Sequence, residues 1–269
     1  MPEIAEVRTV VKHLDKHIVG KKIIGIDIFY PKMIDNIDEF KREVIGKTFK
    51  CFSNYGKWII ISLGDKSILG HLRMEGKFFI KNKDDEINKH EHVIFYLDDG
   101  TTLRYHDTRK FGRMKLVDTN EIYKLNEISK LGIEPDSKML TANYIYEMIH
   151  KKNIPIKTLL LDQTIINGLG NIYADEVLFA SNILPNRLGS SITMEECEKI
   201  KNSCYKIITK ATSCGGSTIR SYTSSLGVYG TYQDYLMVHT KKVCSVCGSN
   251  IIKTRVGGRG TYYCPKCQK

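Results

Sequence analysis

Acidic residues are missing from the end of this sequence, since no Asp or Glu follows Asp234. The same stretch carries seven basic residues: Lys241, Lys242, Lys253, Arg255, Arg259, Lys266 and Lys269. Over all 269 residues the net charge is +11, which predicts a nucleic acid, an acidic lipid or an acidic substrate as partner. Because the tail mixes basic residues with glycine, tyrosine and cysteine, it indicates a phosphate-facing module; a solubilising tail is the alternative.

Long apolar runs are also missing. No stretch reaches the roughly 18 apolar residues of a membrane-spanning helix, and no apolar signal-peptide block follows the first residues. We therefore expect no membrane partner and a cytoplasmic location. A hydrophobic content of 42% is ordinary for a globular chain, and the length favours two domains.

Eight cysteines are present, and four of them have a regular spacing. Cys244, Cys247, Cys264 and Cys267 form two C-x-x-C pairs, which is typical of one tetrahedral structural zinc site. Disulfides are the alternative, and a reducing compartment disfavours them. The other four cysteines, which have no regular spacing, are Cys51, Cys197, Cys204 and Cys214.

Strand patterns fill the first half of the chain. Runs rich in Ile, Phe, Tyr and Val lie within residues 22–106, and Gly64-Asp65 and Asp99-Gly100 mark hairpin turns. Successive antiparallel strands predict a sandwich or flattened barrel that ends near residues 131–137.

Helical patterns follow. They cover residues 141–152, 156–166, 171–183 and 193–213, and Thr193 with Glu196 fits a capping box. The turn 167–171 holds two glycines and two asparagines ahead of a helix, which is a suitable seat for a phosphate. Residues 215–233 are rich in Ser, Thr, Gly and Tyr and predict a loop that closes over a ligand, or a disordered linker.

The first residues, MPEIAEVRTV, predict a helix start. Proline suits the first helical position, carboxylates suit the positive end of the helix dipole, and apolar residues recur at helical spacing. Taken alone, this stretch has a purely structural interpretation.

Four separated motifs, one of them in residues 1–10, indicate a functional role for the start of the chain as well. They are P-E-x-x-E at residues 2–6, Gly56-Lys57 with HLRMEG at residues 71–76, Asp162-Gln163 with GLGNIYADE at residues 168–176, and the four-cysteine hairpin with Gly257-Gly258-Arg259 at its tip. In this order, over essentially the whole chain, they resemble bacterial formamidopyrimidine-DNA glycosylases.

The resemblance implies an α+β fold in three parts. A helix-flanked β-sandwich would cover residues 1–133, a helix–two-turn–helix domain with a lesion-capping loop at about 215–233 would cover residues 134–234, and a zinc finger would cover residues 235–269. It also implies one structural zinc ion, no organic cofactor, and a monomer that binds double-stranded DNA containing oxidised bases. The implied location is bacterial cytoplasm, on the nucleoid.

The resemblance further implies a bifunctional glycosylase and lyase for oxidised purines. Pro2 would be the nucleophile once Met1 is removed, since a terminal amine with an ordinary pKa of about 7.7–8.0 is less protonated than a lysine. Glu3 would be the acid that protonates the sugar ring oxygen, which requires a raised carboxyl pKa. Lys57 would assist β-elimination and Arg259 δ-elimination; a generic surface lysine is the alternative for Lys57.

Other family residues match DNA contacts. The implied DNA-binding residues are His71, His90, Arg109, Lys152 and Asn171, with Lys151 as an alternative to Lys152. Met74, Arg109 and Phe111 would fill the gap left by an extruded base, as a thioether, a guanidinium and an aromatic ring can. The implied lesion pocket contains Glu6, Glu75, Ser217 and Ser221. Ordinary sheet core is the alternative for Met74 and Phe111, and a helix-start acid for Glu6.

The sequence departs from the family pattern at a few positions. Ala5 replaces a usual proline and Arg8 a frequent glutamate, while residues 238–240 and 231–233 differ around the base of the loop. These departures put loop conformation and fine substrate preference in doubt. Two rival functions remain: the sister enzyme endonuclease VIII, which prefers oxidised pyrimidines, and a catalytically silent DNA-binding zinc protein.

Overall fold

The computed structural model describes residues 1–217 and 230–269. These residues form two compact units. The first contains Met1–Ser129 and the described ends of the segment Gly215–Gly230, and the second contains Lys130–Cys214 and Thr231–Lys269. The sequence-based boundaries differ, because they put residues 215–230 with the helical segment and separated the zinc finger from it. Contacts from Gly216 and Ser217 to the first helix explain the first difference.

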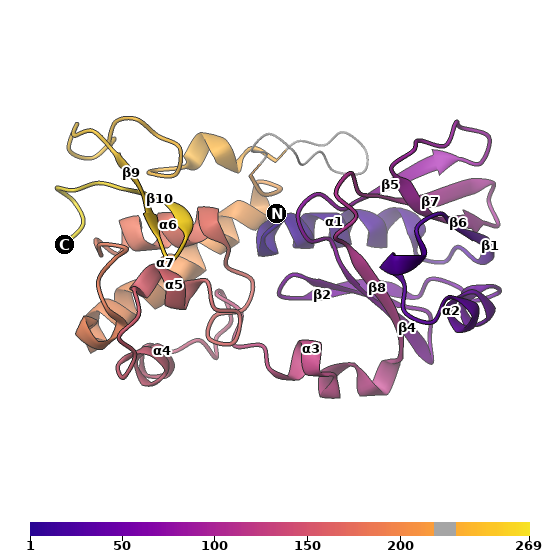
Figure 1. Ribbon diagram of the computed structural model, residues 1–269, viewed down its shortest axis with the longest axis horizontal. Helices are drawn as coiled ribbons and strands as arrows, with labels where there is room; N and C mark the ends of the chain where they lie inside the picture. Colours follow the sequence, from indigo (N-terminus) through magenta and orange to yellow (C-terminus); the bar gives the residue numbers. More distant parts are fainter. Residues whose placement is uncertain (218–229) are drawn as a thin grey trace. The chain divides into compact units, whose positions relative to one another are not determined.

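The described residues of the first unit form eight strands in two antiparallel sheets (Figure 1). One sheet has the order β2-β3-β4-β8 and the other β1-β6-β7-β5. The strands are β1 Ile23–Ile28, β2 Cys51–Tyr55, β3 Trp58–Ser62, β4 Lys66–His71, β5 Lys77–Asn82, β6 Glu91–Leu97, β7 Thr101–His106 and β8 Arg113–Asp118. The predicted hairpin turns at Gly64-Asp65 and Asp99-Gly100 join β3 to β4 and β6 to β7.

The chain passes between the two sheets at neighbouring points. β4 leads into β5 of the other sheet, and β7 leads back into β8. The ladders align the ends of these strands, since His71 pairs with Arg113 and Lys77 pairs with His106. Residues 72–76 and 107–112 therefore form two adjacent turns at one end of the sandwich.

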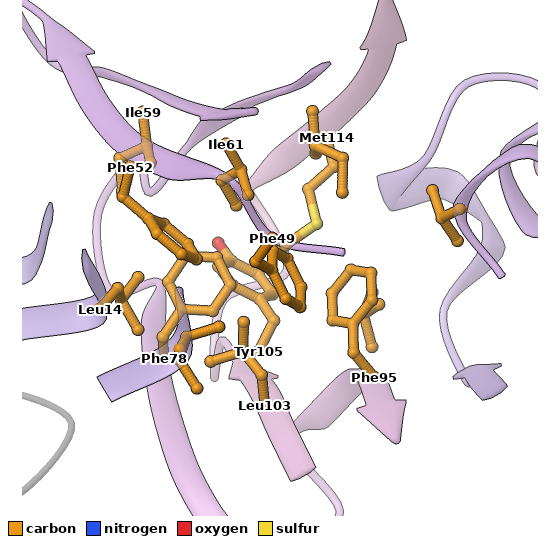
Figure 2. Packing of buried hydrophobic residues seen from close by; sticks show 14 of the residues in the cluster. Leu14, Phe49, Phe52, Ile59, Ile61, Phe78, Phe95, Leu103, Tyr105 and Met114 are labelled. Atoms are coloured by element: carbon orange, nitrogen blue, oxygen red, sulfur yellow. The ribbon is translucent and has the colours of Figure 1, made fainter. Parts of the chain in front are cut away.

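Helix α1, Ile4–Ile18, contacts β2 and contributes its apolar face to the sandwich core. Its buried residues include Val7, Val10 and Leu14, which recur at the predicted spacing. Aromatic residues from both sheets complete this core, and Figure 2 shows Phe52, Phe78, Phe95 and Tyr105 packed with Leu14 and Met114. Further elements of the unit are α2 Ile37–Val44, α3 Asn126–Ser129 and the short 3₁₀ helices Pro31–Met33 and Thr119–Lys124.

The second unit is helical and ends in a two-stranded hairpin (Figure 1). Its helices are α4 Ala142–Ile149, α5 Ile156–Leu160, α6 Asn171–Ala180 and α7 Met194–Ser213, with 3₁₀ turns at Gly189–Ser191 and Tyr232–Tyr235. The Thr193–Glu196 capping box is present as predicted, with the Glu196 N–H donating to Thr193 Oγ1 at 3.2 Å. The hairpin strands are β9 Ile252–Val256 and β10 Arg259–Tyr263.

The α+β fold class expected from the sequence is confirmed by these two units. Strands precede helices, and the four regularly spaced cysteines close the chain. Among the described helices, none is both long and apolar enough to cross a membrane.

Candidate functional site

The start of α1 is a buried polar corner. Glu3 is the N-cap and only 3% exposed, and Glu6 in the first turn is 4% exposed. The Glu3 N–H donates to Glu6 Oε2 at 2.9 Å, so the two acids form a capping interaction and satisfy a main-chain donor that the helix leaves unpaired. Pro2 is buried beside them. The predicted helix start is therefore also a place where two carboxylates are shielded from water.

The terminal amine shares this corner. Burial lowers the pKa of the Met1 amine below its ordinary value; the carboxylates of Glu3 and Glu6 oppose this shift, Lys57 reinforces it, and Glu75 weakly opposes it. Glu3 and Glu6 at the start of the chain, Lys57 in the β2–β3 turn and Glu75 after β4 thus all shift the pKa of one amine. This environment favours the neutral, nucleophilic form.

Lys57 occupies a tight turn. Tyr55 pairs with Trp58 across the β2–β3 hairpin, which leaves Gly56 and Lys57 as a two-residue loop. Gly56 has φ of +55°, as the first central residue of a type II′ turn requires. The turn directs Lys57 inward, and its side chain is only 5% exposed. A generic surface lysine does not fit this burial.

His71 ends β4 and has a fixed protonation pattern. Its Nδ1 accepts the Arg73 N–H at 2.9 Å, so the proton of the neutral ring lies on Nε2. The ring lies edge-on to Trp58 with centroids 4.8 Å apart. Burial, with Arg73 and Lys57 nearby, lowers the pKa of His71 to about 3. His71 is thus a neutral hydrogen-bond donor rather than a cation.

Glu6 also holds the beginning of the segment that follows α7. Its Oε1 accepts the Ser217 N–H at 2.7 Å. A Cβ on Gly216 would lie only 2.6 Å from the same oxygen. The φ of Gly216 is +82°, in the left-handed region, so both the short distance and the backbone conformation require glycine at this position. Glu6 and Ser217, two predicted pocket residues, are therefore in contact. Ser221 and most of the predicted capping loop lie outside the described residues.

The predicted gap-filling residues lie on the two adjacent turns. Met74 is 36% exposed and Phe111 48% exposed, which excludes sheet core for both. The Arg109 guanidinium stacks over the Phe111 ring, 4.8 Å from its centroid. Glu75 accepts a hydrogen bond from Thr108, which links one turn to the other. Arg109 and Phe111 are therefore in direct contact, and the turn that carries them is linked to the turn that carries Met74.

Asp107 organises the second turn and was not predicted. It is fully buried, and its two carboxylate oxygens accept the N–H groups of Arg109 at 2.9 Å and Gly112 at 2.8 Å. A buried carboxylate that accepts main-chain N–H groups fixes the backbone of a turn. The Asp-x-Arg spacing, typical of an Asx turn, was the available sequence signal.

The remaining predicted DNA contacts are less enclosed. His90 is half-buried at the start of β6, with its ring 5.6 Å from that of His106. Lys151 is exposed and Lys152 half-buried just after α4. Nothing in these surroundings distinguishes the two lysines.

In the second unit, Asn171 meets the hairpin. Asn171 begins α6, and its Nδ2 donates to the Gly260 carbonyl at 2.9 Å. Gln163 shapes the preceding turn by donating to the Leu169 carbonyl and accepting the Gly168 N–H, both at 2.9 Å. Arg259 is exposed next to Gly260. Asn171 and Arg259 are thus brought to one place from positions far apart in the sequence.

A buried ion pair supports the same hairpin and was also missed. Lys157 and Asp175 are both fully buried, with Lys157 Nζ 2.7 Å from Asp175 Oδ1. Lys157 donates to the Gly260 carbonyl at 2.9 Å and to Thr261 Oγ1 at 2.8 Å. On the other carboxylate oxygen, Asp175 lies 2.7 Å from His239 Nδ1. His239 is one of the departures from the family pattern, and this network gives it a partner.

The four predicted metal ligands lie together. Their Sγ atoms all fall within 4.8 Å of one another, and pairs of them are 3.8 and 3.4 Å apart. A tetrahedral zinc ion with Zn–S bonds of about 2.3 Å needs sulfurs about 3.8 Å apart, whereas a disulfide needs about 2.05 Å. The residues therefore fit zinc, which would tie the hairpin to a small core around Phe179 and Val238. All eight cysteines are unbridged.

Comparisons with known proteins agree with these features. Residues 1–114 match the formamidopyrimidine-DNA glycosylase N-terminal domain, residues 131–223 match its H2TH domain, and residues 241–269 match a zinc finger found in FPG and IleRS. The chain is 42% identical to formamidopyrimidine-DNA glycosylase of Streptococcus mutans over 100% of both chains. It is 44% identical to the Bacillus cereus protein of that name, over 100% of this chain and 99% of the relative.

Solved structures give the same result. A complex between Lactococcus lactis Fpg and DNA containing an abasic site has a TM-score of 0.94 at 39% identity, covering 99% of both chains. A complex of the wild-type L. lactis protein with N7-benzyl-Fapy-dG DNA has a TM-score of 0.94 at 38% identity, covering 100% of both.

Proposed function

The chain belongs to the formamidopyrimidine-DNA glycosylase family, and from this premise we propose that it is a base-excision repair enzyme. It removes oxidised purines, namely 8-oxoguanine and formamidopyrimidines, from duplex DNA. It then cleaves the strand at the resulting abasic site as a lyase. The observation that carries the proposal is the start of the chain, where Pro2 and Glu3 are buried and where the buried Lys57 lies close enough to lower the pKa of the Met1 amine.

Base removal begins with the amine of Pro2, once Met1 has been removed. The neutral amine attacks C1′ of the damaged nucleotide, and the C1′–N bond breaks with its electron pair leaving on the base. The departing base takes up the proton that the amine loses. Glu3 donates a proton to O4′, which opens the sugar ring and leaves an iminium between Pro2 and C1′. The dipole of α1 disfavours a positive charge at this end of the helix, and burial lowers the pKa of the Met1 amine there. The same surroundings would favour the neutral form of the Pro2 amine once Met1 has been removed.

Strand cleavage follows from the iminium. Loss of a proton from C2′ expels the 3′-phosphate, and a second elimination expels the 5′-phosphate. Lys57 assists the first step through its contact with the phosphate, and Arg259 assists the second. Water then releases the sugar fragment from Pro2.

Several of the predicted residues hold the DNA strand. His71 donates Nε2–H to a phosphate, Asn171 and Arg259 contact the backbone, and His90, Arg109 and Lys152 add further contacts. Met74, Arg109 and Phe111 fill the space left by the everted nucleotide. Glu6, Glu75, Ser217 and Ser221 contact the lesion. Zinc bound by the four cysteines holds the hairpin that carries Arg259. The enzyme acts as a monomer.

Borohydride trapping tests the proposal. We expect the zinc-loaded protein to form a covalent adduct with an 8-oxoguanine duplex, and a Pro2→Gly, Glu3→Gln double variant to form none. Glu121→Gln, which removes a carboxylate from a salt bridge on the first unit, is the matched control and keeps trapping. Mass spectrometry of the N-terminus confirms beforehand that Met1 is absent.

Two results would overturn the proposal. Absence of an adduct from protein lacking Met1 favours a catalytically silent DNA-binding protein. A preference for a thymine glycol duplex assayed side by side favours the endonuclease VIII specificity.

A further inference from the structure

Two turns carry the side chains that fill the DNA gap, and each contains a residue in an unusual conformation. Arg73 has φ of +54° and directly precedes Met74, while Lys110 has φ of +58° and directly precedes Phe111. Non-glycine residues rarely adopt this left-handed region. Both turns are therefore held in conformations that the surrounding structure must impose.

Tyr105 lies between these turns. It is the penultimate residue of β7, only 1% exposed, and its ring packs edge-on against Phe78 with centroids 5.1 Å apart. Figure 2 shows the ring within the sandwich core, with the hydroxyl oxygen in red at its far end. The ring is therefore anchored, and the position of its hydroxyl is fixed.

The hydroxyl meets one glycine from each turn. A Cβ built on Gly76 would lie 2.1 Å from Tyr105 Oη, and a Cβ built on Gly112 would lie 1.8 Å from the same atom. Neither glycine has a positive φ that would explain its identity. Each is required because the backbone approaches the Tyr105 hydroxyl too closely for any side chain. The Tyr105 hydroxyl oxygen thus limits how closely the backbones of Gly76 and Gly112 can approach the core.

Other contacts hold the turns against this spacer. Asp107 fixes the backbone of the second turn through the N–H groups of Arg109 and Gly112. Thr108 donates a hydrogen bond to Glu75, which ties the second turn to the first. The ladder pairs at both ends of the turns prevent them from moving apart. The Tyr105 hydroxyl is then a spacer between two backbones that are otherwise drawn together.

We propose that Tyr105 is a positioning residue for the gap-filling side chains: its hydroxyl sets the separation of the turns that carry Met74 and Arg109–Phe111. This inference rests on the proposed function, because it assigns a role in base eversion to a residue that touches neither DNA nor the reacting atoms. Without the hydroxyl, the turns relax into the vacated space and the three side chains lose their common alignment. Eversion of the damaged base then weakens, and so does hydrogen bonding from the displaced Arg109 guanidinium to the cytosine opposite the gap.

Tyr105→Phe tests the proposal with the smallest possible change. We expect excision of 8-oxoguanine opposite cytosine to slow by about tenfold to a hundredfold, the loss expected when a site is misplaced by about 1 Å. We expect cleavage of a preformed abasic site to change little, because that substrate needs no base eversion. Discrimination between cytosine and adenine opposite the lesion should fall as well. A merely structural role would not separate these three measurements.

Tyr96→Phe is the matched control. Tyr96 lies on β6 of the same sheet and also uses its hydroxyl, donating to Asp27 at 2.8 Å, yet it contacts neither turn. We expect this variant to keep wild-type excision and opposite-base discrimination.

A second experiment requires no enzyme activity. Gly112→Ala should lower the melting temperature sharply, because the three atoms nearest to the added Cβ all belong to Tyr105. The loss should be partly restored in Gly112→Ala, Tyr105→Phe, which removes the nearest of them, the hydroxyl oxygen at 1.8 Å, and keeps the two ring carbons. Gly76→Ala should be restored less, because its Cβ also meets the Leu72 carbonyl at 2.5 Å. Gly25→Ala, whose Cβ meets Tyr96 at an ordinary 3.6 Å, serves as the tolerated glycine control.

The outcomes separate the inference from the proposed function. If wild-type protein traps on damaged DNA while Tyr105→Phe excises and discriminates normally, the inference is wrong and the function stands. Additive melting-temperature losses for Gly112 and Tyr105 would also overturn it. If the wild-type protein fails to trap, the function is wrong, and the melting-temperature experiment still decides whether Tyr105 is the spacer.

Discussion

The carboxylate of Glu6 joins the start of α1 to Ser217, 211 residues further along the chain. One oxygen of Glu6 accepts the Glu3 N–H at 2.9 Å, and the other accepts the Ser217 N–H at 2.7 Å. The side chain next to the proposed catalytic acid is therefore also the anchor for the segment that begins the capping loop. Any change that moves Ser217 should therefore also displace Glu6 and, through it, the backbone of Glu3.

Gly216→Ala should impair catalysis through this anchor. The added Cβ would meet Glu6 Oε1 at 2.6 Å, and the left-handed backbone adds about 1–2 kcal/mol of strain. We expect excision of 8-oxoguanine to fall by about tenfold or more, since a displaced catalytic group of this kind has large effects. Gly46→Ala is the control, because Gly46 has φ of +86° but nothing within 4 Å of its Cβ. Equal activity losses in the two variants would show that strain alone matters.

DNA binding should not depend on protonation of His71. Burial, Arg73 and Lys57 lower the pKa of His71 to about 3, so the ring is neutral at its ordinary pKa of 6.5 and gains a proton only as the pH approaches the lowered value. We expect the ratio of affinities for abasic-site DNA between wild type and His71→Gln to stay constant as the pH falls through 6.5. Fluorescence anisotropy measures the ratio. A ratio that grows as the pH falls would mean that His71 contacts phosphate as a cation.

The rate of adduct formation should depend on pH through the terminal amine. Burial lowers the pKa of the Met1 amine from its ordinary value of 8.0. We expect the same surroundings to lower the pKa of the Pro2 amine that replaces it after Met1 is removed, so that a larger fraction is neutral at any given pH. We expect the rate to rise with pH and to level off below pH 8.0, because protonation of the amine blocks attack. Single-turnover borohydride trapping on abasic DNA gives the profile. A midpoint above the ordinary value would show that the carboxylates of Glu3 and Glu6 outweigh burial.

Much of this molecule is visible in local sequence patterns. The Thr193–Glu196 capping box, the Asp99-Gly100 hairpin and the spacing of the four cysteines each depend on neighbours within a few residues or on metal chemistry. Helix α2 and strand β8 escaped detection. Ile37, Phe40 and Val44 recur at helical spacing, but α2 has only eight residues, and its N-cap Asn36 is left-handed without a side-chain cap, so no helix-start signal marks it.

The supporting residues of the site could not be predicted for a different reason. Lys157 finds its partners at Gly260 and Thr261, more than 100 positions away, and Tyr105 matters through two glycines in separate turns. Such side chains are conspicuous only after folding brings the segments together. The motif residues, by contrast, were accessible because they lie in short local motifs that resemble those of a known family.

Loss of the metal should disable the second unit's hairpin. The cysteines contribute to a core of only a few buried residues around Phe179 and Val238, so most of the hairpin's stability would come from zinc. We expect Cys247→Ser to lower zinc content and DNA affinity together, measured by atomic absorption and anisotropy. Cys51→Ser, which changes an exposed cysteine outside the cluster, is the control. Full DNA affinity in zinc-free protein would contradict this prediction.

Lys157→Met should destabilise the second unit strongly, because it leaves the buried Asp175 carboxylate without its cation. Breaking a buried ion pair in this way costs about 3–5 kcal/mol, whereas replacing both partners costs less. We expect Lys157→Met, Asp175→Leu to regain part of the melting temperature lost in the single variant. Lys199→Met, which breaks the exposed Lys199–Glu195 pair on α7, should barely change the melting temperature.

Lys157 also holds the Gly260 carbonyl beside Arg259. The double variant should therefore remain impaired in δ-elimination while β-elimination persists, and gel analysis of the cleaved strand distinguishes the two products. Recovery of both eliminations with stability would mean that Lys157 only stabilises the fold and does not position Arg259.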